Sequence, residues 1–167
     1  LSDHGWNEKN LPKLVFSYIN SIPNSYEFER IKASLSAAGW PKSKVTSKSY
    51  PGYGALIQDV RKGLVQITGN VVWHMDYPDA ENIFQLFYSP NKSPGVNSSH
   101  YNNPEFDALF QIVSKMMPGP DRTQIYKKMN QMLTDDCVWI SGFALNYIHT
   151  WKKEVTMYPM QGMMGLS

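Results

Sequence analysis

The sequence predicts an α/β fold, in which strands and helices alternate along the chain. Strand-like segments with alternating apolar residues come between helical segments whose apolar residues recur every three or four positions, and glycines stand at several predicted helix ends. The length of 167 residues suits one domain with one hydrophobic core. Alternating strands and helices favour a layered arrangement in which helices cover a sheet.

The first elements are a strand, a helix and a second strand. Residues 11–19 alternate between two partly covered faces and predict a strand. Asn24 and Glu27 have the spacing of a capping box and open a helix, for which Gly39 is the expected C-terminal cap. Residues 45–49 predict the second strand. The buried face of the helix is expected to carry Phe28, Ile31, Leu35 and Ala38.

The middle of the chain repeats this order. Residues 52–62 predict a helix that stops at Gly63, residues 64–72 predict a strand that leads into Trp73, and residues 79–88 predict a short helix. The inward positions of the first of these helices are Tyr53, Leu56, Ile57 and Val60. An aromatic residue and a nearby carboxylate are therefore expected just beyond a strand end.

Two further helices follow. Asn103 is a good N-cap with Pro104 in the first helical position, and the segment 118–120 (PGP) ends this helix before Asp121 opens the next. The expected buried faces are Phe106, Leu109, Phe110 and Val113 in the first helix, and Ile125, Met129, Met132 and Leu133 in the second. Residues 138–148 predict an apolar strand.

Composition excludes several functional classes. The net charge is only +2 and the 16 basic residues are scattered, so no basic stripe predicts a nucleic-acid partner. No apolar run is long enough to span a bilayer. The single cysteine, Cys137, leaves no internal disulfide, and its apolar surroundings favour a buried position.

Asp76 has two interpretations from its local sequence. It is either an exposed turn residue bonded to nearby backbone N–H groups, or a carboxylate that anchors a cationic group of a ligand. Trp73 is either a core residue or the aromatic wall of a cleft. His74 has no partner residues at a metal-binding spacing, so no metal site is expected.

Asp79 and Glu81 form an acidic cluster with Asp76. Paired carboxylates can hydrolyse glycosides, which leaves a hydrolase as one alternative. Asp79 is better explained as the N-cap of the short helix. The sequence has no Gly-x-Ser-x-Gly elbow, phosphate loop, dinucleotide fingerprint or His-Glu-x-x-His motif, so we expect no enzymatic activity and no cofactor.

Two segments carry a resemblance to a known family. They are residues 73–79 (WHMDYPD) and 101–109 (YNNPEFDAL), and a helix with Arg122 and Tyr126 four residues apart follows them. In this order they resemble the extracellular solute-binding proteins (family 5) of peptide and nickel ABC importers. The resemblance implies a type II periplasmic-binding-protein-like fold, with a mixed sheet flanked by helices. The chain, residues 1–167, would be a single domain, the C-terminal lobe of a longer two-lobed protein.

The resemblance also implies roles for individual residues. Asp76 would meet the α-ammonium group of a bound peptide, and Trp73 would line the cleft. Asn97 and Tyr101 would lie near the cleft or support its wall, with loop packing as the alternative. Asp107, Arg122 and Tyr126 would be scaffold residues.

The implied function is that of the substrate-binding component of an ABC importer. Such a protein captures oligopeptides between two lobes and delivers them to a membrane permease, which works with an ATPase. The expected location is the periplasm, or the cell exterior with a lipid anchor. Because the family also contains binders of nickel chelates, haem and small sugars, a non-peptide solute is the other open alternative.

Overall fold

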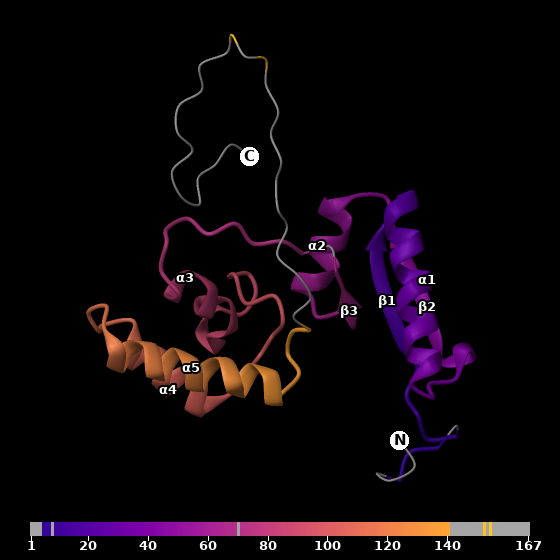
Figure 1. The fold of residues 1–167 in the computed structure, drawn as a ribbon. Helices are drawn as coiled ribbons and strands as arrows, with labels where there is room; N and C mark the ends of the chain where they lie inside the picture. The colour runs from indigo at the N-terminus through magenta and orange to yellow at the C-terminus, as the bar shows by residue number, and fades with distance from the viewer. Residues whose placement is uncertain (1–4, 8, 70, 141–151, 153, 155–167) are drawn as a thin grey trace. The chain divides into compact units, whose positions relative to one another are not determined.

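Strands, helices and their connections form two units, Leu1–Trp73 and His74–Ser167 (Figure 1). The structure is a computed structural model and describes residues 5–7, 9–69, 71–140, 152 and 154. Each unit is described by itself.

The first unit contains a parallel sheet of three strands in the order β2-β1-β3. The strands are β1 (Leu14–Ile19), β2 (Val45–Tyr50) and β3 (Ile67–Thr68). Leu14 pairs with Val45 at one end of the sheet, and Phe16 of β1 pairs with Ile67. Parallel neighbours require crossover connections, which α1 (Ile22–Ala37) and α2 (Tyr53–Arg61) supply. The predicted α/β class is therefore confirmed.

The first helix begins three residues earlier than the predicted capping box. Ser21 is its N-cap, and its hydroxyl accepts a hydrogen bond from the Asn24 N–H at 3.3 Å. The Asn24 side chain instead donates to the carbonyl of Ile19 at 2.7 Å. Pro23 in the first turn fits the earlier start, because its fixed φ suits the opening of a helix. The prediction of Asn24 as the cap was wrong.

Apolar side chains between the helices and the sheet form the core of this unit. Phe16, Phe28 and Val45 are buried together, and the rings of Phe16 and Phe28 lie 6.1 Å apart. Leu56 and Val60 of α2 are buried against Tyr50. Tyr53, predicted to face inward, is exposed because it lies in the first turn of α2, beyond the end of this cluster.

Both predicted glycine stops are confirmed. Gly39 follows α1 with a φ of +93°, and Gly63 follows α2 with a φ of +70°. A Cβ disfavours this left-handed conformation, so glycine is the residue that ends a helix in this way at least cost.

The third strand is much shorter than predicted. Residues 64–72 were expected to be strand-like, but of those that the structure describes only Ile67–Thr68 pairs, against Phe16 and Ser17. Leu64 and Val72 are exposed and outside the sheet. Trp73 therefore follows an irregular segment and not a strand end.

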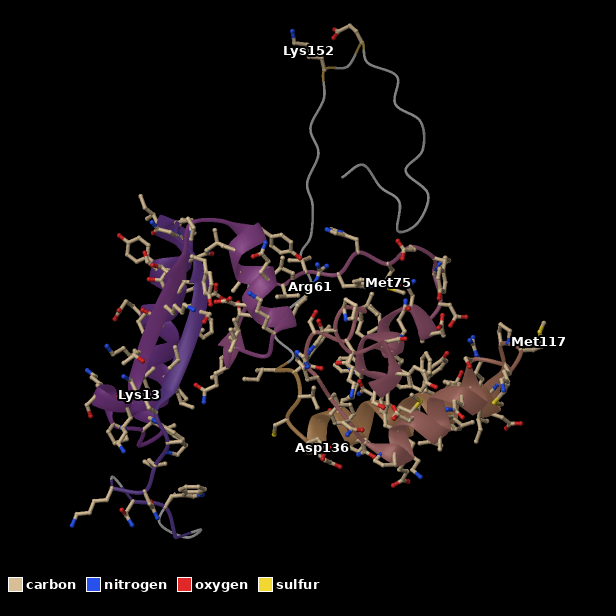
Figure 2. All side chains as sticks on the ribbon, turned by 180° about the vertical axis from the view of Figure 1, so that it is seen from behind. Lys13, Arg61, Met75, Met117, Asp136 and Lys152 are labelled. Carbon is tan, nitrogen blue, oxygen red and sulfur yellow. The ribbon has the colours of Figure 1, made fainter. Side chains whose placement is uncertain are left out.

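In the described part of the second unit, the regular elements are all helices. They are α3 (Glu81–Phe84), the 3-10 helices η3 (Gln85–Phe87) and η4 (Ser89–Asn91), and the longer helices α4 (Pro104–Val113) and α5 (Pro120–Asp135). Figure 1 shows α4 and α5 alongside each other, with α3 close to them. Met117 lies in the connection between α4 and α5, and Asp136 at the other end of the pair (Figure 2).

Aromatic rings dominate the core of the second unit. Phe87 and Phe106 are almost completely buried, and their rings meet edge to face at 6.2 Å. Phe84 stacks on Tyr126 at 4.9 Å, which joins α3 to α5. Phe110, Val113, Met129 and Leu133 complete the buried helix faces. Most of the predicted inward positions of α4 and α5 are thus confirmed.

Two predictions near the end of the chain concern the burial of Cys137 and a strand at residues 138–148. Cys137, predicted to be buried, is exposed, because it follows the last turn of α5 with a φ of +51°. Residues 138–140 form no strand, and the remainder of the predicted strand at 138–148 lies outside the described residues.

Candidate functional site

Asp76 lies in an exposed bend that leads into α3. Its backbone N–H donates a hydrogen bond to Oδ1 of Asn82 at 3.3 Å, and Asn82 is completely buried. Among the described residues, no cation lies within ion-pair distance of the Asp76 carboxylate. The bend therefore fixes the backbone of Asp76 and leaves its charge facing solvent.

Asp79 closes this bend two residues before α3 begins at Glu81. Its Oδ1 accepts a hydrogen bond from the Glu81 N–H at 2.9 Å, as expected of a capping residue. Its Oδ2 lies 2.5 Å from Nη1 of Arg122, and the Tyr126 hydroxyl lies 3.4 Å from Oδ1. The Arg122 hydrogen bond holds the pKa of the Asp79 carboxyl below its ordinary value of 3.8.

Arg122 joins three segments of the second unit. Its Nε donates to the carbonyl of Val113 in the last turn of α4 at 3.1 Å, while Nη1 reaches Asp79. The guanidinium also lies over the ring of Tyr126, 5.1 Å from the centroid. Arg122 and Tyr126 thus contact one another and Asp79, which supports the scaffold role that the resemblance implies.

Glu81 is hydrogen-bonded to its neighbour Tyr77. The Tyr77 hydroxyl donates to Oε2 of Glu81, and this bond together with partial burial raises the pKa of Tyr77. Asp79 has a lowered pKa and is occupied by Arg122, whereas a general acid needs a raised one. The geometry of these carboxylates does not favour the hydrolase alternative.

Asn97 is completely buried in the loop after η4. Its Nδ2 donates to the carbonyl oxygens of Tyr88 at 3.2 Å and Tyr101 at 3.0 Å, and its Oδ1 accepts from the Ser99 hydroxyl at 3.0 Å. These bonds join the start of η4, at Tyr88, to the end of the loop, at Tyr101. They match the loop-packing alternative for Asn97.

Tyr101 connects the start of α4 to the end of α5. Its hydroxyl donates to Oδ2 of Asp136 at 2.6 Å and accepts from Nδ2 of Asn103 at 3.0 Å. Its ring meets Phe106 edge to face at 5.4 Å. Burial, and then the bond to Asp136, raise the pKa of Tyr101 to about 12. Tyr101 is therefore fixed firmly at the base of the loop.

The cap and scaffold residues of α4 are as the sequence predicts. Oδ1 of Asn103 accepts from the N–H groups of Glu105 and Phe106 at 3.0 and 3.3 Å. The Asp107 carboxylate accepts from the backbone N–H of Ser89 at 2.9 Å and from its hydroxyl. Asp107 thus holds η4 against α4, which is a structural role.

Trp73 is half-buried and is the last residue of the first unit. Asp76, Asn97 and Tyr101 all belong to the second unit. Asn82 and Asp136 are the site residues that sequence reasoning missed. No pattern marks either one, because each acts through a contact with another segment.

Neither a metal-binding cluster nor a membrane-spanning helix occurs among the residues that the structure describes. The described part of the chain contains no group of three or more His, Cys, Asp or Glu residues that could hold a metal ion. Within the same part, no helix has the length and apolar character needed to cross a bilayer.

The fold resembles two solved periplasmic proteins. One is MppA, a periplasmic murein tripeptide-binding protein in its unliganded open form, with a TM-score of 0.66 and 19% identity over 82% of this chain. The other is Haemophilus influenzae OppA in complex with the peptide RPPGFSPFR, with a TM-score of 0.63 and 23% identity over 81% of this chain.

The fold is that of type II periplasmic binding proteins. The chain spans a quarter of the length of each of these proteins, since the match covers 25% of both. No protein-family model and no curated protein matches the sequence.

Proposed function

We propose that this chain is the C-terminal lobe of a two-lobed solute-binding protein that captures oligopeptides for an ABC importer. The single observation that carries the proposal is the Asp76 carboxylate, which is exposed and unpaired among the described residues while its backbone is held by buried Asn82. The fold likeness to two proteins whose names describe peptide complexes or tripeptide binding supports it.

The chemistry of Asp76 suits a peptide N-terminus. A carboxylate that is not already paired can accept a charge-assisted hydrogen bond from an α-ammonium group, which contributes about 1.5–3 kcal/mol. Closure of a second lobe over this pair would remove water and strengthen the attraction. Asp76 therefore fixes the N-terminus of the ligand and leaves its side chains unselected.

The other candidate residues have different roles in this proposal. Trp73 lines the cleft, where an aromatic face tolerates many ligand side chains. Asn97 and Tyr101 support the wall from within, because their polar atoms are already bonded inside the second unit. They shape the loop and do not contact the ligand directly.

The wider setting follows from the same proposal. The two-lobed protein works in the periplasm, or outside the cell with a lipid anchor, and its closed form docks on a membrane permease driven by an ATPase. An extended peptide lies between the lobes and bonds to them through its backbone, in the manner of an added strand.

Native mass spectrometry of the full-length protein as purified tests this proposal. The expected result is a spread of small peptide masses on the wild-type protein that is lost in the Asp76→Asn variant. One discrete non-peptide mass that the substitution does not change would instead assign the protein to another solute, such as a nickel chelate, haem or a sugar, and would remove Asp76 from the site.

A further inference from the structure

The bend that carries Asp76 has few attachments to the rest of its unit. Residues 76–79 belong to no helix or strand, and an irregular segment of this kind is free to move unless side chains hold it. Two local attachments are the bond from the Asp76 N–H to Asn82 and the bond from the Tyr77 hydroxyl to Glu81. Since Asn82 and Glu81 both lie in α3 (Glu81–Phe84), these bonds fix the bend to that helix.

A further attachment is the Asp79 side chain, which extends beyond α3. Its Oδ1 accepts the local hydrogen bond from the Glu81 N–H and lies 3.4 Å from the Tyr126 hydroxyl. Its Oδ2 meets Arg122, which is 43 positions later in the chain and lies in the first turn of α5. Arg122 therefore connects the bend to the longer helices of the unit.

Arg122 is itself held in one position. Its Nε bonds to the carbonyl of Val113, and its planar head lies over the Tyr126 ring. The side chain is only 11% exposed and that of Asp79 is 28% exposed, so water screens the pair less than it screens a surface pair. A lysine has one charged nitrogen and cannot make the contacts to Asp79 and Val113 with the same geometry.

We infer that Arg122 is a positioning residue, which acts through Asp79 to set where the Asp76 carboxylate stands. This inference rests on the proposed function, in which Asp76 meets the amine of a ligand. Arg122 touches no ligand, and its effect is to hold the acceptor in place. Its loss therefore weakens recognition of the amine specifically, because a binding group that is loosely held loses much of its contribution.

Calorimetry on the full-length protein with trialanine and N-acetyl-trialanine tests the inference. Arg122→Met is expected to lower the affinity for trialanine by about tenfold and the affinity for the acetylated peptide by about twofold at most. The matched control is Lys128→Met on the same helix, which breaks the exposed pair between Lys128 and Glu105 at 2.6 Å. This control is expected to change neither affinity.

Conservative variants separate positioning from a general loss of structure. Arg122→Lys is expected to restore the preference for the free amine only in part. Asp79→Asn keeps the acceptor for the Glu81 N–H and removes the charge that meets Arg122, so it tests the same link if Arg122→Met does not fold. A folded Arg122→Met or Asp79→Asn variant that keeps the full free-amine preference would overturn the inference.

A second measurement does not depend on any ligand. In a proton–nitrogen NMR spectrum of the chain, the Asp76 amide resonance is expected to shift or broaden in Arg122→Met and to remain unchanged in Lys128→Met. An unchanged Asp76 resonance in Arg122→Met would overturn the positioning role directly.

A failure of the proposed function and a failure of the positioning role of Arg122 give different results. If Asp76→Asn leaves the preference for trialanine unchanged, the proposed function fails. If Asp76→Asn removes the preference while Arg122→Met keeps it, only the positioning role of Arg122 fails.

Discussion

Nη1 of Arg122 lies 2.5 Å from Oδ2 of Asp79, and this pair joins the first turn of α5 to the bend that carries Asp76. The same guanidinium bonds to the last turn of α4 through the Val113 carbonyl. One side chain thus connects the bend to the facing ends of α4 and α5, which come much later in the sequence. We therefore expect both the stability of the second unit and the position of the Asp76 carboxylate to depend on Arg122.

Removal of the Arg122 side chain is expected to destabilise the folded protein. Arg122→Met should lower the free energy of unfolding by about 2–3 kcal/mol, because it breaks charged hydrogen bonds to Asp79 and Val113 in a largely buried position. Lys128→Met should cost less than about 1 kcal/mol, because that pair is exposed. Urea unfolding followed by circular dichroism measures both, and equal losses would contradict this assignment.

The Asp79 carboxylate should make the free energy of unfolding depend on pH in the acidic range. Its pKa in the folded protein lies below 3.8, so the stabilisation is present above 3.8 and is lost as the pH falls through the lowered value. The difference in unfolding free energy between the wild type and Asp79→Asn should be constant near neutral pH and shrink below about pH 4. Urea unfolding at several pH values across this range measures the difference. If the difference between the wild type and Asp79→Asn grew as the pH fell, the lowered pKa of Asp79 would be contradicted.

Asn103 should contribute more than its exposed neighbour Asn102. Asn103→Ala removes the cap of α4 and the bonds to Tyr101 and Asp136, and should lower the free energy of unfolding by about 1–2 kcal/mol. Asn102→Ala is the control and should change it by at most about 0.5 kcal/mol. The cap assignment fails if thermal unfolding shows the same change for both variants.

Two glycines offer a test of backbone conformation with opposite expected signs. Gly39→Ala should destabilise the protein by about 1–2 kcal/mol, because φ is +93° there. Gly54→Ala lies inside α2, where an added Cβ meets nothing within 4 Å, and should stabilise by about 0.5–1 kcal/mol. A shift of the melting temperature in the same direction for both would show that the conformational argument is wrong.

Local signals in the sequence are enough to predict much of the fold. The Asn103-Pro104 start of α4 and the stops at Gly39 and Gly63 depend on residues within one turn, and all three are confirmed. The cap of α1 was missed because Ser21 and Asn24 are both good caps, and the Glu27 spacing favoured the wrong one. The length of β3 was missed because pairing with β1, and not local pattern, decides where a strand ends.

The candidate site was only partly accessible to sequence reasoning. Asp76 stands out through its neighbours Trp73 and Tyr77, and Arg122 was assigned to the scaffold. The contact between Arg122 and Asp79 spans 43 positions, and the bond between Tyr101 and Asp136 spans 35. No helical or strand period relates residues at such separations, so these partners emerge only from the packed structure.

The most direct test of the central claim is calorimetry with wild-type full-length protein and its Asp76→Asn variant, each titrated with trialanine and N-acetyl-trialanine. The wild type should bind the free amine more tightly, and the substitution should weaken trialanine binding by about 10- to 100-fold while it leaves the acetylated peptide nearly unchanged. Equal losses for the two peptides, or no loss for either, would contradict the role of Asp76 as the anchor of a peptide amine.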